Sequence, residues 1–259
     1  MDQEAGKRLV AALAENFGEI ECVRAVALAG SRGAGSSDLE SDYDLYVYSD
    51  AGVPEELRRG LLGKAAEIDN RFWETGDEAV DAQTRMRVDI MYRTPRWIED
   101  QLDRVLARHE ASVGYSTCFW FNVLHSAALV DRSGWYAGLR ERAGQPYPEK
   151  LRQAIVAKNW PILRRNQSSY RHQIEVALWR GDAFSVQHRV TALLASFFDV
   201  WFALEREPHP GEKRLLAHLP LEWGRRVKEV LESDRATLLE RIEALLDPLD
   251  QRLKAEGLI

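Results

Sequence analysis

Hydrophobic positions in the first hundred residues alternate between helical and strand-like periods. Residues 3–17 carry apolar side chains at helical spacing and Gly18 follows them, which predicts an amphipathic helix. The segments CVRAVALAG and DYDLYVY are short and apolar, so each predicts a strand, and the glycine- and serine-rich SRGAGSSDLES predicts a loop between them. Pro54 opens another helix, RFWETGDEAV and RMRVDIMYR predict two more strands, and residues 96–108 predict a helix.

The pattern changes beyond the middle of the chain. The stretch FNVLHSAALVDRSG ends like a buried strand followed by a turn, and two prolines then interrupt the pattern in AGQPYPEK. After them only helical periods recur, over residues 149–165, 168–180, 184–206 and 222–247. We therefore predict an α+β fold, with a mixed sheet and flanking helices in an N-terminal domain (1–145) and an all-α helical bundle in a second domain (146–259).

Composition narrows the class of protein. The chain has 259 residues, of which 45% are hydrophobic and 29% charged, which is ordinary for a globular protein with its own core. No run approaches 18 apolar residues and the first residues lack an apolar signal core, so we expect a cytoplasmic protein with no membrane partner. Cys22 and Cys118 both lie in apolar contexts, which favours buried free thiols over a disulfide.

Charge is distributed unevenly along the chain. The net charge is −6, but residues 1–100 hold 12 Lys and Arg against 21 Asp and Glu, whereas residues 151–226 hold 12 against 7. An acidic half joined to a basic helical half is what a site for a metal and a polyanion would present, although drift in surface charge gives the same pattern. Nucleic acid is an open but not a favoured partner, because the acidic half would repel it.

A glycine-rich stretch holds the most informative motif, although two familiar readings fail. The segment from Gly30 to Gly35 lacks the lysine of a Walker loop and the third glycine of a Rossmann fingerprint. Asp42 and Asp44 follow at the start of a predicted strand, where alternate side chains share a face. Two carboxylates so placed repel each other, and a divalent cation removes that cost.

Asp89 adds a third carboxylate. It lies between Val88 and Ile90 in a predicted strand, where an acidic side chain is costly unless it is paired or ligates a metal. If this strand neighbours the strand of Asp42 and Asp44, the three carboxylates meet on one sheet face. Such a triad can hold two metal ions for an in-line phosphoryl displacement.

Gly-Ser, ten residues, then Asp-x-Asp on a strand resembles the signature of the nucleotidyltransferase superfamily that includes DNA polymerase beta. The later strand carboxylate, the segment CFWFNVLHSAALVDRSGWYAGL and the helical second half are similar to the small bacterial branch that modifies aminoglycoside and lincosamide antibiotics. HPGEKRL, at residues 209–215, resembles a segment of uncharacterised members of that group. The resemblance implies Mg²⁺ as cofactor, two ions with Mn²⁺ as a substitute, and a nucleoside triphosphate (NTP) as co-substrate.

The resemblance also assigns roles to residues. Gly30 and Ser31 would hold the β- and γ-phosphates, while Asp42, Asp44 and Asp89 would be the catalytic metal ligands. Four further candidates each have two open interpretations. Arg32 adds charge beside the nucleotide or is a solvated loop residue, and Lys158 and Lys213 contact the triphosphate or lie on a solvated helix face. Glu74 is a general base or a residue at a strand edge. Arg85 and Arg87 could neutralise Asp89 instead, which would leave its metal role in doubt.

These observations lead to an expected activity. We expect an enzyme that transfers a nucleoside monophosphate, AMP by preference, from an NTP to an acceptor hydroxyl with release of pyrophosphate. The expected acceptor is a small molecule such as an antibiotic. Two alternatives stay open: a toxin-type enzyme acting on a protein or tRNA, and a catalytically silent module that senses nucleotides.

Overall fold

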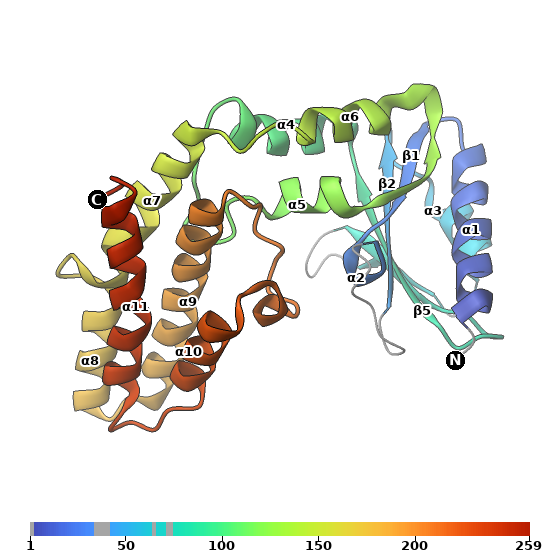
Figure 1. Cartoon of the computed structure of the whole chain (residues 1–259). Coiled ribbons are helices and arrows are strands. Elements are labelled where there is room, and N and C mark those ends of the chain that lie inside the picture. The colour runs from blue at the N-terminus through green and yellow to red at the C-terminus, as the bar shows by residue number, and fades with distance from the viewer. Residues whose placement is uncertain (1–2, 34–41, 64–65, 71–74) are drawn as a thin grey trace. The chain divides into compact units, whose positions relative to one another are not determined.

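The structure is a computed structural model that describes residues 3–33, 42–63, 66–70 and 75–259 (Figure 1). It divides into two compact units. The first, the sheet unit, contains Met1–Leu102 and Asn122–Gln145; the second, the helical unit, contains Asp103–Phe121 and Pro146–Ile259. The segment 103–121 thus belongs to the helical unit, whereas the expected division placed it in the N-terminal domain. Its backbone is held by side chains of the helical unit, and no local sequence period reports such long-range contacts.

The sheet unit has the predicted α+β character. Its elements are α1 (Gln3–Glu19), β1 (Val23–Leu28), α2 (Gly30–Gly33), β2 (Tyr43–Ser49), α3 (Glu55–Leu62), β3 (Glu67–Asn70), β4 (Gly76–Val80), β5 (Arg87–Arg93), α4 (Pro95–Leu106), α5 (Cys118–His125), β6 (Ala127–Asp131), η1 (Arg132–Gly134) and α6 (Trp135–Ala143). The residues of α4 and α5 are divided between the sheet unit and the helical unit. The described strands form one mixed sheet in the order β3-β4-β5-β2-β1-β6. Only the β2–β5 pairing is parallel among these neighbours.

Strand alternation gives the two faces of this sheet different roles. One face of the sheet packs in the core with the apolar side of α1 and includes Leu45, Val47, Val88 and Ile90. Figure 1 shows helix α1 along one side of the sheet. The alternate residues of β2 and β5 lie on the opposite face. There the aromatic ring of Tyr48 packs against residues of α6. The same alternation places Asp44 and Asp89 on this second face.

Two local predictions in the sheet unit need correction, and one strand was not predicted. Gly30, expected at the end of a strand, and residues 31–33, expected in a loop, form the helical turn α2, and residues 34–41 of the predicted loop lie outside the described residues. β3 was not predicted, because its four residues are too few for a periodic signal. The expected buried strand near residue 130 is β6, which is largely exposed because it forms the sheet edge beside β1.

The helical unit is built around one long apolar helix. Its elements are α7 (Glu149–Arg164), α8 (Tyr170–Arg180), α9 (Ala183–Glu205), η2 (Leu215–His218), α10 (Leu221–Leu231) and α11 (Leu238–Ala255). The apolar stripe of α9 is fully buried in the core, as its period predicts. The helix predicted over 222–247 is in fact two helices. Asp234 breaks it by accepting hydrogen bonds from the backbone N–H groups of Ala236 and Thr237.

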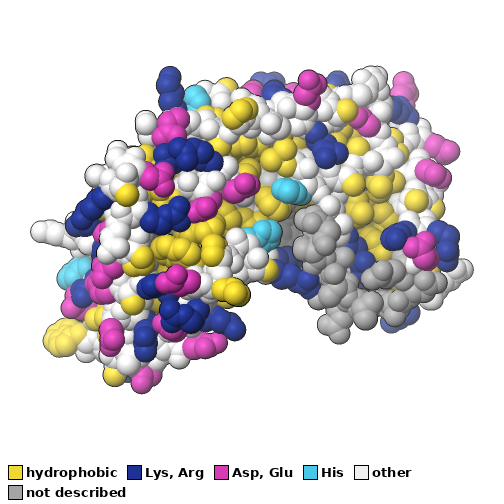
Figure 2. Space-filling view, in the orientation of Figure 1, with side chains coloured by type: hydrophobic (Ala, Val, Ile, Leu, Met, Phe, Trp, Pro, Cys, Tyr) yellow, Lys and Arg dark blue, Asp and Glu magenta, His cyan; other side chains and the backbone are white. Residues whose placement is uncertain are grey.

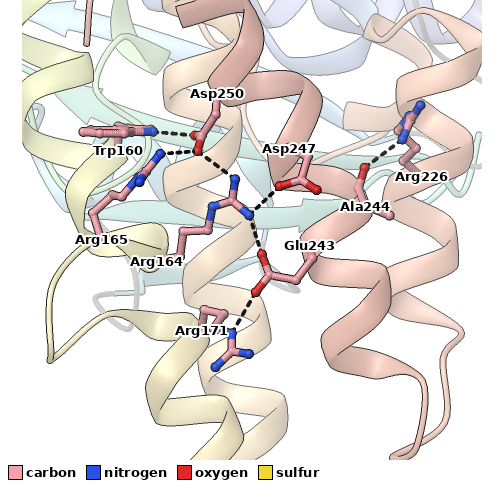
Figure 3. A network of polar contacts seen from close by, with 9 residues as sticks. All are labelled: Trp160, Arg164, Arg165, Arg171, Arg226, Glu243, Ala244, Asp247 and Asp250. Carbon is pink, nitrogen blue, oxygen red and sulfur yellow. Dashed lines mark hydrogen bonds and ion pairs between the residues drawn. The ribbon is translucent and has the colours of Figure 1, made fainter. Parts of the chain in front are cut away.

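Ion pairs join α7 to α11 beside this core (Figure 3). Arg164 contacts Glu243, and it also pairs with Asp247 and Asp250 at 2.7 Å each. Asp250 further accepts hydrogen bonds from the indole N–H of Trp160 at 2.6 Å and from Arg165 at 2.8 Å. Burial alone would raise the pKa of Asp250, but these hydrogen bonds and charges outweigh it and hold the pKa below its ordinary value.

Surface charge in the helical unit is mixed. Figure 2 shows Lys and Arg side chains interspersed with Asp and Glu side chains over the face in view, rather than gathered into a patch of one sign. Cys22 and Cys118 are free thiols, as predicted, but both are partly exposed rather than buried. Within the described residues, none of the helices combines the length and apolar character needed to cross a membrane.

Candidate functional site

The parallel pairing of β2 with β5 creates the candidate site. In this register Tyr43 lies opposite Val88, and Asp44 lies opposite Asp89. Because both strands alternate in step, the two aspartates lie on the same face of the sheet. The sequence could predict this arrangement only on condition that the two strands are neighbours, and the structure meets that condition. Asp42 directly precedes β2 and is partly exposed.

Asp89 is the electrostatically unusual member of this group. Its side chain is half-buried, and its Oδ1 atom is shielded from solvent without a hydrogen-bond partner. Burial and, to a smaller extent, the neighbouring carboxylates of Asp42, Asp44 and Glu78 raise the pKa of Asp89 to about 6, while Arg87 acts in the opposite direction. A carboxylate in this setting gains from any cation that approaches it.

Gly30 is required next to Asp44. Its φ of +60° lies in the left-handed region, and a Cβ atom on it would come within 1.7 Å of Asp44 Oδ2. A side chain at this position would therefore displace the carboxylate. The structure thus gives one reason for glycine here, namely room for the carboxylate of Asp44, and the expected contact of Gly30 with a phosphate stays a prediction. Ser31 follows in α2, and its proposed phosphate contact stays a prediction.

The arginines near the carboxylates have defined positions. Arg87 Nε lies 3.7 Å from Asp42 Oδ1, so Arg87 forms an ion pair with Asp42, while its charge also lowers the pKa of Asp89. Arg85 precedes β5 and has a φ of 61°, so it lies outside the strand that carries Asp89. The guanidinium of Arg32 lies 4.0 Å from the centre of the ring of Tyr43, the residue that follows Asp42 in the chain.

Glu78 extends the row of carboxylates across the sheet. It lies opposite Asp89 in the antiparallel register of β4 and β5, and it accepts a hydrogen bond of 2.7 Å from the amide of Asn70 on β3. Sequence reasoning missed Glu78 and selected Glu74, which lies outside the described residues. Its place in a predicted strand was the available signal, but only the register of β4 against β5 places it opposite Asp89.

The donor set fits a hard divalent cation in kind, because it offers carboxylate oxygens of which one is buried without a partner. The side chains are not gathered into a cage. Within the described part of the chain, no group of three or more His, Cys, Asp and Glu side chains is arranged so that it could hold a metal ion. The pairing of Asp42 with Arg87 draws one of the three expected ligands toward a cation of the protein itself.

The two expected lysines belong to the helical unit. Lys158 is exposed on α7, and Lys213 is exposed in the connection between α9 and η2. Arg164, in contrast, already has three carboxylate partners in the helical unit. Contacts of Lys158 and Lys213 with a triphosphate stay predictions.

The chain is similar to a domain family and to a solved structure. Residues 120–215 match the model of a domain of unknown function, DUF4037, which spans well under half of the chain. A search of the curated proteins finds no match. Among solved structures, a nucleotidyltransferase-like protein from Exiguobacterium sibiricum 255-15 is similar at 14% identity and a TM-score of 0.47, over 96% of this chain and 74% of that one.

Proposed function

We propose that the protein is a metal-dependent nucleotidyltransferase, which transfers a nucleoside monophosphate from an NTP to the hydroxyl of an acceptor and releases pyrophosphate. The observation that carries this proposal is the register pair of Asp44 and Asp89, with Asp42 close enough to raise the pKa of Asp89. The order Gly30-Ser31, Asp42, Asp44, Asp89 along the chain supports it.

Each residue of the site would have a distinct task. Asp42 and Asp44 would hold both metal ions and Asp89 the catalytic one; when bound, these ions supply charge that lowers the pKa of the acceptor hydroxyl and offsets the charge of the leaving pyrophosphate. The backbone at Gly30 and Ser31 would hold the terminal phosphates, with Arg32 nearby. Occupancy would require Asp42 to exchange Arg87 for the metal.

The transfer itself makes one bond and breaks one. The acceptor oxygen forms a bond to the α-phosphorus, the bond from that phosphorus to the β-phosphate oxygen breaks, and pyrophosphate leaves with the electron pair. Asp89 would receive the proton of the acceptor hydroxyl. We propose AMP as the transferred group and a small molecule such as an antibiotic as the acceptor. The interspersed surface charges in Figure 2 do not favour a nucleic-acid acceptor on that face.

Thermal unfolding with each NTP, with and without Mg²⁺, tests the proposal. A ligand at about 100 times its dissociation constant stabilises a protein by roughly 2.7 kcal/mol, which a melting curve detects. We expect Mg²⁺-dependent stabilisation by at least one NTP, lost in an Asp42→Asn/Asp44→Asn variant and kept in Asp50→Asn, an exposed control that follows the same strand. Pyrophosphate release in an acceptor screen then separates a transferase from a silent sensor. A folded protein that no NTP stabilises would contradict the proposal.

A further inference from the structure

An open cavity of about 820 Å³ lies in the helical unit where α7 ends and α8 begins. Its wall comes from the end of α7, the connection to α8, the first turn of α8 and Glu243 of α11. All of these segments belong to the helical unit. Pockets of about 300–1,000 Å³ are large enough to enclose most of a small ligand. The chemistry of this wall therefore indicates which kind of ligand the cavity suits.

Three arginines supply the positive charge of the cavity wall. Arg164 and Arg165 come from the end of α7 and Arg171 from the first turn of α8. Glu243 is the one carboxylate among the described residues that line the cavity. Both of its oxygens already accept from arginines, Oε2 from Arg164 and Oε1 from Arg171 (Figure 3). The wall thus carries three positive side chains against one negative side chain that is paired.

The other carboxylates of this network hold the arginines without lining the cavity. Within the described structure these are Glu175, Asp247 and Asp250. Asp250 pairs with Arg165 at 2.8 Å, and Glu175 contacts Arg171. Ion pairs of this kind fix the guanidinium groups in place, so a ligand loses less side-chain entropy when it binds them. The carboxylates therefore prepare the arginines rather than fill the cavity.

Arg165 and Arg171 keep donors for a ligand. Nη2 of Arg165 donates to Asp250, while its Nε and Nη1 have no hydrogen-bond partner among the described residues. Arg171 uses Nε for Glu243 and Nη1 for Glu175, which leaves its Nη2. The side chains of Arg165 and Arg171 are 44% and 28% exposed, so a ligand in the cavity can reach them. A phosphate group accepts such N–H donors in charge-assisted hydrogen bonds.

The rest of the cavity wall is polar. It consists of Asn166, Gln167, Ser168, Ser169 and His172. The described lining contains no aliphatic side chain and no Phe, Tyr or Trp ring, so a nucleobase would find no large ring on which to stack. Amide and hydroxyl groups both donate and accept hydrogen bonds, which suits a ligand with several hydroxyl groups. The wall therefore favours a phosphorylated, hydroxyl-rich molecule over a nucleotide.

We propose that this cavity binds a sugar phosphate or a similar phosphorylated polyol. The phosphate contacts Arg165 and Arg171, and the hydroxyl groups contact the amide and hydroxyl side chains of residues 166–169. The inference goes beyond the proposed function and does not depend on it. Its ligand is not the NTP, and its residues all lie in the helical unit, whereas the candidate metal ligands lie in the sheet unit.

Isothermal titration at constant ionic strength tests the inference, with glucose 6-phosphate, inorganic phosphate and glucose as probes. We expect glucose 6-phosphate to bind more tightly than inorganic phosphate, because the sugar adds hydrogen bonds, and glucose alone to bind more weakly than either. Arg165→Gln/Arg171→Gln should weaken the binding of both phosphates roughly tenfold or more, because charge-assisted hydrogen bonds are lost. The matched control is Arg225→Gln, which removes an exposed arginine with a carboxylate partner on α10 and should leave binding unchanged.

A second variant fills the cavity and leaves the ion pairs intact. Ser168 is exposed in the connection between α7 and α8 and lines the cavity, so Ser168→Trp should block the binding of glucose 6-phosphate. Gln187→Trp, which adds the same ring at an exposed position of α9, is its control and should keep binding. Should Arg165→Gln/Arg171→Gln fail to fold, Ser168→Trp decides the inference.

The outcomes separate this inference from the proposed function. Wild-type protein that binds neither phosphate overturns the inference, as does binding that survives both Arg165→Gln/Arg171→Gln and Ser168→Trp. Equal affinity for glucose 6-phosphate, inorganic phosphate and sulfate would overturn the assignment of a sugar phosphate. Asp42→Asn/Asp44→Asn should leave the binding of glucose 6-phosphate unchanged, and its loss in this variant alone would move the ligand to the sheet unit. A protein that no NTP stabilises contradicts the proposed function only.

Discussion

Two aspartates, Asp89 in the sheet unit and Asp250 in the helical unit, show opposite responses to burial. Asp250 receives hydrogen bonds from Trp160, Arg164 and Arg165, and its pKa lies below the ordinary value. The Oδ1 atom of Asp89 has no partner in the described structure and other carboxylates surround it, so its pKa rises to about 6. Burial penalises both charges, but hydrogen-bonded arginines compensate Asp250, whereas the charge of Arg87 does not offset burial and the neighbouring carboxylates at Asp89. A compensated charge suits stability, and an uncompensated one suits a ligand that brings the missing charge.

The largest expected effect concerns the compensated aspartate. Asp250→Ala should lower the free energy of unfolding by about 3–5 kcal/mol, because it leaves the partly buried Arg164 without its most buried carboxylate partner. Asp247→Ala is a matched control: it removes a carboxylate from the same guanidinium, but this one is 62% exposed, so the loss should stay below about 1 kcal/mol. Urea denaturation measures both, and equal losses would remove the distinction.

Asp199 sharpens the comparison, because its partners are hydrogen-bonding but neutral. Burial raises its pKa to about 6 despite hydrogen bonds from Ser116. A carboxyl with a raised folded-state pKa stabilises most below its unfolded value near 3.8, and this contribution is lost as pH rises through about 6. Asp199→Asn should therefore gain about 3 kcal/mol relative to wild type between pH 4 and pH 7. Urea denaturation at each pH measures this difference, in which unchanged groups cancel; a flat difference would contradict the prediction.

A smaller effect is expected at the uncompensated aspartate. Asp89→Asn should raise the free energy of unfolding by about 1 kcal/mol at pH 7 in the presence of a chelator, since it removes a half-buried charge next to other carboxylates. The same variant should lose Mg²⁺-dependent stabilisation by NTP. Destabilisation in the chelator would mean that Asp89 has a structural partner after all.

The smallest effect is expected at Arg87. Its ion pair with Asp42 is 3.7 Å long and its side chain is 60% exposed, so Arg87→Gln should change the free energy of unfolding by less than about 0.5 kcal/mol. Loss of this competing cation should strengthen the Mg²⁺ dependence of NTP binding about two- to threefold, as judged by titration calorimetry. Weaker NTP binding instead would assign Arg87 to the nucleotide. Arg59→Gln, in an exposed helical pair, is the control.

Much of the secondary structure was predictable from local periods. The helix of residues 3–17, the strands around Asp44 and Asp89 and the long apolar helix around Phe197 all follow spacings that a single element determines. The failures have long-range or very local causes. β3 is too short to show a period, and Asp234 divides a predicted helix by its own hydrogen bonds to the backbone.

The buried contact between Asp199 and Ser116 had a weaker sequence signal. Asp199 interrupts the apolar run LLASFFDVWF, and an acidic residue in a buried helix must find partners or remain costly. That argument predicts a buried polar contact, but it does not identify Ser116, which is 83 residues away. His209 lay in a segment chosen by resemblance, and its packing on Tyr115 depends equally on distant parts of the chain.

Bonded geometry and spacing along the chain are enough to predict which side chains share a strand face, and they give the order Gly30, Asp42, Asp44, Asp89. The folded arrangement was needed to show that Asp44 lies opposite Asp89, that Arg87 pairs with Asp42, and that Asp250 has hydrogen-bonded cations where Asp89 Oδ1 has no partner. These depend on which distant residues meet. Electrostatic energies depend on distance and burial, and no local spacing contains either quantity.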